Sequence, residues 1–349
     1  MPFIEIVLLY CLKNISGERT IYSILHILNG KKSSQTIQDI HLFQLTKLFQ
    51  TFPELSRKDF EAMMKNLKMD GWLEQISKQH VVISKDKQNE LERLLVKNPI
   101  PKHLNGWNYH QQTNVFWERL SLFVQVAAHL KVGKRHYIPV QRDRSIQEWL
   151  KEALANIEMP RNRISERLYG ELVACLNHDG IDPRYFVLRL TGCGNIGLTV
   201  HQGAQKLQVD KDYYHVYFLS ILHFMMDHIK KWEGDFPLLK KMIKKTEQNL
   251  PLTFSSAKTY HYIQRGYRIE EISAIRQLKE STIEDHIVEI ILNIPTFPIS
   301  EYVTEDNFVR IKNCVKKLET KSLKLIKENL QNVSYFEIRV VLAKLGDKI

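Results

Sequence analysis

The segment from residues 253 to 293 constrains the fold most, because its pattern predicts three short helices separated by two tight turns. SSAKTYHYIQRG is expected to begin with Ser255 or Ser256 as its N-cap and to end at Gly266. RIEEISAIRQ follows as a second short helix, and a turn of three residues leads into a third. Three helices in this order predict a helix-turn-helix.

The third predicted helix, STIEDHIVEIIL, carries a capping box of Ser281 and Glu284. Isoleucines should form its buried contact with the second helix, at positions Ile272, Ile275, Ile283 and Ile287. Exposed residues near the start of such a helix touch base edges in DNA-reading proteins. On the third helix we expect an exposed row formed by Thr282, Asp285, His286 and Glu289. The nucleic-acid-binding candidates of this segment are Arg276, Lys279, Ser281, Thr282 and His286.

The charge of this segment argues against a simple role in base reading. Residues 254–293 contain five Lys and Arg against six Asp and Glu. Carboxylates facing phosphates are unfavourable, although Glu or Asp can accept a hydrogen bond from cytosine. The domain could instead dock a protein, or grip DNA through a lysine-rich flank that could equally be an ordinary solvated face: Lys312, Lys316, Lys317, Lys321, Lys324 and Lys327.

The N-terminal part of the chain predicts three helices followed by a hairpin, the order found in winged-helix domains. Ser56 should cap the third helix, and an Asp70-Gly71 pair should end it. WLEQIS and HVVIS are short β-prone runs separated by Lys78 and Gln79, which predicts the hairpin. A generic helical cap with a small hairpin is the alternative.

A proline-containing linker near residue 100 precedes a basic helical bundle. The expected fold is mainly α, with a winged-helix-like domain at 1–95, the bundle at 96–250 and the helix-turn-helix domain with extra helices at 251–349. The bundle segment holds 22 Lys and Arg against 15 Asp and Glu, so it supplies +7 of the net charge of +11. A polyanion is therefore the natural partner.

Within the bundle, KVGKRHYIPVQRDR concentrates five cations around one aspartate in a segment whose Gly and Pro predict a loop. Several cations on one loop can neutralise phosphates independently of sequence. We expect single-stranded, forked or duplex DNA to contact this loop; the alternatives are pairing with neighbouring carboxylates and receipt of an acidic protein tail, such as that of single-stranded DNA-binding protein. The predicted contact residues are Lys131, Lys134, Arg135, Arg142 and Arg144.

Two patterns that suggest other chemistry have simpler structural explanations. Gly192 to Gly197 spells G-x-G-x-x-G, but a dinucleotide fingerprint needs a preceding strand, and the preceding residues predict a helix after Asp182 and Pro183. His223 and His228 lie five residues apart on one helix and diverge by about 140°, so they do not share a face as metal ligands. We therefore expect no cofactor, no metal site and no enzymatic activity.

The four cysteines match neither a disulfide framework nor a zinc spacing, and the apolar start of the chain is too short to span a bilayer. That start also lacks the basic residues and cleavage site of an export signal. We expect a protein of the cytoplasm, associated with the nucleoid and not with a membrane.

The string GYRIEEISAIRQLKESTIEDHIVEI resembles the helix-turn-helix at the C-terminus of some RecQ-type helicases. The matching positions include Gly266, Arg276 and His286, and a later segment contributes Ser334, Tyr335, Ile338 and Arg339. Taken whole, the chain is similar to the YpbB-type family of bacterial proteins, which carry this tail without helicase motors.

The resemblance implies a DNA-binding accessory or adaptor protein that acts with a RecQ-like helicase in DNA recombination or repair. A sequence-specific transcription regulator that uses the same helix-turn-helix is the alternative, because response regulators share part of the pattern.

Overall fold

The computed structural model describes residues 1–134, 136–244 and 252–346, and the expected mainly helical fold is confirmed. Near the N-terminus, Ser56 Oγ accepts a hydrogen bond from the backbone N–H of Asp59, as predicted for the N-cap. The predicted hairpin is also confirmed, with Leu73 opposite Ile83. The elements of this region are α2 (Tyr22–Asn29), α3 (Ser34–Leu42), η1 (Thr46–Leu48), α4 (Arg57–Met69), β1 (Leu73–Ser77), β2 (His80–Ile83) and η2 (Lys85–Lys87).

The chain divides into two compact units. The first, here called the bundle unit, comprises Met1–Val7 and Leu91–Lys245, and the second, here called the helix-turn-helix unit, comprises Leu8–Glu90 and Thr246–Ile349. The division therefore runs through α1 (Phe3–Ile15) and α5 (Gln88–Lys97). The N-terminal and C-terminal segments, expected as separate domains, share one unit because α3 packs against helices of the C-terminal segment.

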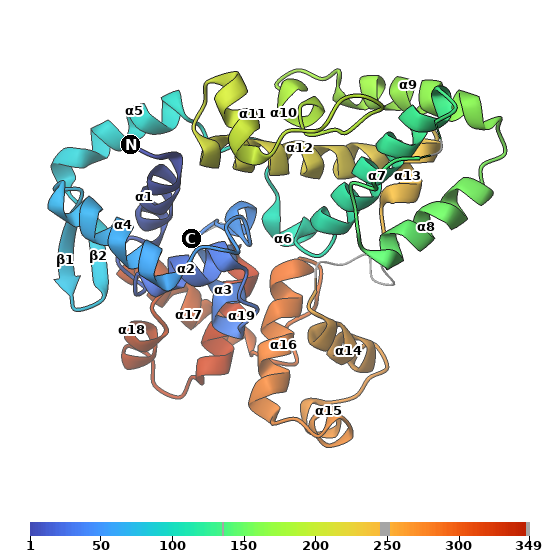
Figure 1. Cartoon of the computed structure of the whole chain (residues 1–349). Coiled ribbons are helices and arrows are strands. Elements are labelled where there is room, and N and C mark those ends of the chain that lie inside the picture. The colour runs from blue at the N-terminus through green and yellow to red at the C-terminus, as the bar shows by residue number, and fades with distance from the viewer. Residues whose placement is uncertain (135, 245–251, 347–349) are drawn as a thin grey trace. The chain divides into compact units, whose positions relative to one another are not determined.

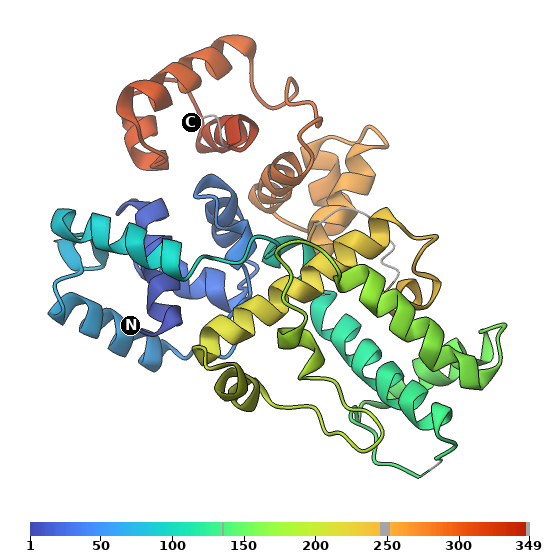
Figure 2. The same cartoon turned by 90° about the horizontal axis from the view of Figure 1, so that it is seen from above.

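In the bundle unit, α7, α9 and α12 contact one another (Figures 1 and 2). Phe116, Phe123 and Phe186 are fully buried in their shared core. The helices are α6 (Gly106–Tyr109), α7 (Thr113–Lys131), α8 (Arg144–Ala155), η3 (Arg161–Arg163), α9 (Ile164–Leu176), α10 (Arg184–Val187), α11 (Val200–Leu207), α12 (Lys211–Lys231) and α13 (Pro237–Met242).

The G-x-G-x-x-G segment is part of the connection from α10 to α11, as expected for a turn between helices. A Cβ atom at Gly197 would lie 2.2 Å from the carbonyl oxygen of Arg189, so only glycine fits there. On α12, His223 is buried, and its Nδ1 accepts a hydrogen bond from the backbone N–H of Asn105 at 2.9 Å. His223 therefore has a structural role in the core.

In the helix-turn-helix unit, α16 is the central helix of the C-terminal segment. It packs against α14, α15, α19 and also α3. The helices are α14 (Phe254–Ile263), α15 (Ile269–Arg276), α16 (Glu280–Asn293), α17 (Glu305–Leu318), α18 (Leu323–Glu328) and α19 (Tyr335–Leu345). None of the helices in the described parts of the chain is long and apolar enough to cross a membrane.

Two predicted helix caps are wrong by two or three residues. Thr253, and not Ser255 or Ser256, caps α14, since its hydroxyl oxygen accepts a hydrogen bond from the N–H of Ser256. Helix α16 begins at Glu280, so Ser281 lies inside its first turn and caps nothing.

The predicted isoleucine contact between α15 and α16 is confirmed at three of its four positions. Ile272, Ile283 and Ile287 are fully buried, whereas Ile275 is about half exposed. Ile275 lies on the outer face of α15 because the short helix has only one side covered by α16.

Candidate nucleic-acid interface

Helix α16 does not present the exposed row that its sequence pattern predicts. His286 and Glu289 are both buried, so neither side chain can reach a base edge. Thr282 and Asp285 are half-buried. The expectation of an exposed row is wrong for its second half, because α14 covers one side of α16 while α3 and α19 pack against it as well.

Glu289 holds the start of α14. Its carboxylate accepts hydrogen bonds from the backbone N–H and hydroxyl of Thr253 and from the hydroxyl of Ser256, the last at 2.6 Å. Burial raises the pKa of the Glu289 carboxyl, while these hydrogen bonds act in the opposite direction. Glu289, one of the acidic residues expected to repel phosphates, is therefore used inside the unit to hold the start of α14.

Arg276 joins all three helices of the motif from inside. Its guanidinium donates hydrogen bonds to the carbonyl and hydroxyl oxygens of Ser255, each at 2.9 Å, and to the hydroxyl of Thr259. That hydroxyl also lies 2.8 Å from Nδ1 of His286. Burial, together with the positive charge of Arg276, lowers the pKa of His286 to about 4. Two of the sequence-based candidates, Arg276 and His286, thus form a structural network.

The exposed end of the motif is the turn that leads into α16. Lys279 and Ser281 are exposed, and Thr282 is half-buried beside them. Neither hydroxyl enters a hydrogen bond with another described residue, so both can serve an external partner. The N-terminal turn of a helix also offers free backbone N–H groups, which favour anions. Three of the predicted residues therefore remain together on one exposed surface.

The turn between α14 and α15 adds two cations that sequence reasoning missed. Arg265 and Arg268 are exposed on either side of Gly266, whose φ of 83° forms the turn, and Tyr267 between them is 40% exposed. None of Arg265, Arg268 and Lys279 forms an ion pair within the described residues. A glycine flanked by arginines is the signal that would have identified this turn.

We call Arg265, Arg268, Lys279, Ser281 and Thr282 the turn surface. Acidic residues lie close to it in sequence: Glu270, Glu271 and Glu280 are exposed. One of them is occupied, since the Glu271 carboxylate accepts a hydrogen bond from the N–H of Arg268 at 2.8 Å. The turn surface therefore combines donors for phosphate and base edges with a charge close to neutral, which predicts modest electrostatic affinity.

The lysine-rich flank is partly used inside the unit. Lys321 donates to the carbonyl oxygen of Leu42, and Lys327 to that of Val333. Lys316, Lys317 and Lys324 remain exposed. Lys324 pairs with Glu328 at 3.9 Å, so Lys316 and Lys317 are the two exposed lysines of the predicted flank without an ion pair among the described residues.

The basic loop of the bundle unit connects α7 to α8. Lys131, Lys134, Arg142 and Arg144 are exposed there, whereas Arg135 lies outside the described residues. Gln125 fastens the loop to α7, because its side chain donates to the carbonyl of Ile138 and accepts from the N–H of Val140. The four exposed cations therefore belong to a loop whose backbone is hydrogen-bonded to α7.

The two planar side chains of the basic loop differ in accessibility. Tyr137 is half-buried and its ring lies 4.3 Å from that of His129, whereas His136 is exposed. The single acid of the loop, Asp143, is occupied as the N-cap of α8, where it accepts two hydrogen bonds from Ser145. These bonds lower the pKa of Asp143, because they favour its charged form.

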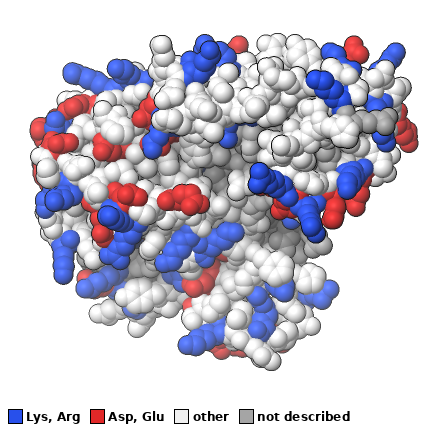
Figure 3. All heavy atoms as spheres, in the orientation of Figure 1, with Lys and Arg blue, Asp and Glu red and all other residues white. Residues whose placement is uncertain are grey.

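Figure 3 shows how charge is distributed over the face drawn in Figure 1. Lysine and arginine side chains occur there in separate groups interspersed with aspartate and glutamate. A single continuous basic area does not cover this face.

Comparison with known proteins identifies the C-terminal domain and a full-length relative. A family model described as a helix-turn-helix domain matches residues 255–342, which suggests DNA as a binding partner. The chain is 36% identical over 351 residues to protein YpbB of Bacillus subtilis (strain 168), covering 99% of this chain and 98% of that relative. No solved structure matches the chain.

Proposed function

Because the chain belongs to the YpbB family, we propose that it is a non-enzymatic DNA-binding adaptor that acts beside a RecQ-like helicase in recombination or repair. The DNA-binding part of the proposed function rests on the turn surface. It places unpaired cations in the turns before and after α15 and free hydroxyls at the start of α16, within a domain that matches a helix-turn-helix family. This is the end of the motif that meets DNA in proteins with this arrangement.

The burial of α16 defines how DNA would be bound. The helix is buried from His286 to Ile291, so it cannot lie along the major groove. Its first turn alone is available, together with Arg265 and Arg268. This geometry favours contacts with phosphates and a few base edges, which gives affinity with little sequence selectivity.

Arg142 and Arg144 of the basic loop supply a second proposed phosphate contact. Both side chains are exposed, and neither forms an ion pair within the described residues. Each phosphate they neutralise would release counterions, so affinity would fall as salt rises.

The helicase part of the proposal is supported by the resemblance of the C-terminal segment to the tails of RecQ-type helicases. Ser334 caps α19 in a capping box with Glu337, and Arg339 extends from that helix toward α16 and α3. A tail of this kind on a chain without a motor would bring a helicase to DNA.

The test measures binding of the full chain to labelled single-stranded, forked and duplex DNA over a salt series, together with co-purification of a RecQ-like helicase. We expect micromolar or tighter binding at low salt, weakening as salt rises, and retention of the helicase. Absence of both binding and retention would overturn the proposal.

A sequence-specific transcription regulator is the second candidate, favoured by the free hydroxyls of Ser281 and Thr282 beside the recognition turn. It predicts a defined footprint on one duplex that Ser281→Ala with Thr282→Val removes. Uniform affinity across unrelated duplexes would exclude it.

A further inference from the structure

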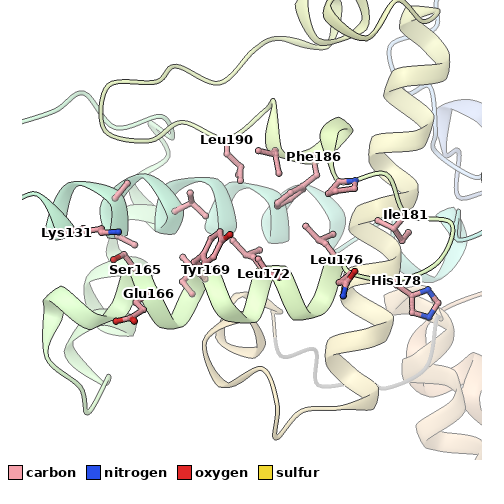
Figure 4. A pocket seen from close by; sticks show the side chains of 18 of the residues that line it. Lys131, Ser165, Glu166, Tyr169, Leu172, Leu176, His178, Ile181, Phe186 and Leu190 are labelled. Atoms are coloured by element: carbon pink, nitrogen blue, oxygen red, sulfur yellow. The ribbon is translucent and has the colours of Figure 1, made fainter.

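The bundle unit contains an apolar groove whose lining includes Lys131, one of the DNA contacts expected from the sequence, but neither Arg142 nor Arg144. It runs between α7, α9 and α10, with a volume of about 960 Å³ (Figure 4). Leu172, Leu176 and Phe186 form part of its floor and walls. Lys131 and Glu166 lie at one end of it and His178 at the other.

Large apolar side chains at the groove are exposed to solvent. Tyr169 is 70% exposed and Val173 47%, and the spacing of four residues places them on the same face of α9. Val187 on α10 is also about half exposed. Apolar side chains concentrated around a concave surface mark a site that another molecule covers.

Exposed cations lie on the chain segments that border one end of the groove, and one of them, Lys131, is a lining residue. Lys134 follows in the turn that closes α7, where its N–H bonds to the carbonyl of His129. Arg161 and Arg163 belong to η3, which packs against α7 and leads directly into α9. None of these four exposed cations forms an ion pair with another described residue, and Glu166 is the one acid in the lining.

The groove matches an α-helix better than an extended peptide. The lining residues follow α9 from Ser165 to Leu176, almost the full length of a 13-residue helix, or about 20 Å. The described part of the bundle unit offers no strand to which a peptide could add by β-pairing. Helical walls on both sides suit an amphipathic helix with apolar side chains on one face.

We infer that this groove binds an acidic amphipathic helix of a partner protein, with its apolar face on α9 and α10 and its carboxylates at Lys131, Arg161 and Arg163. The inference deepens the adaptor part of the proposed function and rests on it, since it names the partner's docking segment. Charge complementarity selects this occupant over a neutral apolar one, because Lys131 in the lining and three unpaired cations on the bordering segments outnumber the single lining acid, Glu166, and attract carboxylates.

The test uses a fluorescein-labelled model peptide of about four helical turns, with Leu and Phe at helical spacing on one face and Glu elsewhere. Two control peptides have the same residues in scrambled order, or Lys in place of every Glu. Fluorescence anisotropy with the full-length protein should show binding of the acidic helix at least about tenfold tighter than of either control.

Variants at exposed positions locate the site without disturbing the core. Val173→Glu and Val187→Glu should each weaken peptide binding at least about tenfold. Val96→Glu, at a position 83% exposed on α5, should leave it unchanged. Lys131→Glu with Arg161→Glu should abolish the preference for the acidic over the basic peptide, whereas Lys151→Glu on α8 should not.

Three results would overturn the inference: equal binding of the acidic peptide and its controls, peptide binding that no groove variant changes, or a dimer of this chain that Val173→Glu dissociates while the peptide fails to bind. A single-stranded oligonucleotide that displaces the peptide from wild type but no longer binds Val173→Glu and Val187→Glu would assign the groove to nucleic acid instead. DNA affinity of Val173→Glu, measured in parallel, should equal that of wild type, so failure of the groove and failure of DNA binding are distinguishable.

Discussion

Arg339 Nη2 lies 2.5 Å from Asp285 Oδ1 and thereby joins α19 to the half-buried side of α16. The same guanidinium nitrogen donates a hydrogen bond to the hydroxyl of Ser34 at 2.9 Å. One arginine thus connects the recognition helix, the C-terminal helix and α3. A deletion of the C-terminal segment would expose the face of α3 that these helices cover, so point variants are the cleaner test of function.

Replacing Arg339 with alanine should therefore destabilise the whole helix-turn-helix unit. We expect the free energy of unfolding to fall by about 1–3 kcal/mol, since a charged hydrogen-bond network with a largely buried donor is lost. Urea denaturation of the full chain measures it. Lys324→Ala removes one member of an exposed pair at 3.9 Å and should behave like wild type; equal effects of the two variants would contradict the account.

Glu289 should stabilise the fold as a hydrogen-bond acceptor and not through its charge. Glu289→Ala leaves the Thr253 N–H and the Ser256 hydroxyl without their partner, which should cost about 2–4 kcal/mol. Glu289→Gln keeps an acceptor oxygen and should lose less than half as much. Glu280→Ala, exposed on the same helix, is the matched control. Thermal unfolding measures the effect. Equal melting temperatures for Glu289→Ala and Glu280→Ala would show that the hydrogen bonds of Glu289 do not stabilise the unit.

The buried imidazole of His286 should make the unit sensitive to acid. Its pKa is about 4 in the folded chain and near 6.5 when unfolded, so the unfolded state binds more protons between these values. The stabilising contribution is fully present above pH 6.5 and is lost as the pH falls toward 4. His286→Asn should therefore lose less stability than wild type between pH 7 and pH 5.

Comparing the pH dependence of stability between wild type and His286→Asn measures the contribution of His286 alone. The pKa of His223 is lowered in the same direction, to about 3, but His223 is common to wild type and variant. His261→Asn, exposed on α14, should retain the wild-type pH dependence. Parallel stability curves for wild type and His286→Asn would contradict the burial of His286.

The basic loop should contribute to the salt dependence of DNA binding. Arg142→Ala with Arg144→Ala should reduce the slope of log affinity against log salt by about one to two units, one for each lost phosphate contact. Lys206→Ala with Lys211→Ala removes two exposed cations from the same unit and should leave the slope intact. An unchanged slope in the loop variant would remove the second contact from the proposal.

Much of the fold could be predicted from local pattern. The cap at Ser56, the hairpin and the long helices of the bundle unit all follow from rules that act within a few residues. The helix-turn-helix was likewise predictable, because Ile272, Ile283 and Ile287 mark its internal contact.

The accessible face of the recognition helix could not be predicted in the same way. His286 and Glu289 are buried by tertiary packing, since both bond to residues at or in α14. Helix α3, which lies about 250 residues earlier in the chain, also packs against α16. One signal was present: Val288, Ile290 and Ile291 place apolar side chains around most of α16, as expected for a helix enclosed on several sides. The apparent acidity of the helix was misleading because two of its four carboxylates, those of Asp285 and Glu289, form internal bonds.

The most direct test of the central claim compares DNA affinity of wild type with that of Arg265→Ala, Arg268→Ala and Lys279→Ala combined. We expect the triple variant to lose at least about tenfold in affinity at low salt and to show a shallower salt slope. A matched triple variant, with alanine at Lys316, Lys317 and Lys324, removes the same charge from α17 and α18 and should lose less. Equal losses, or a greater loss in the matched variant, would contradict binding at the turn surface.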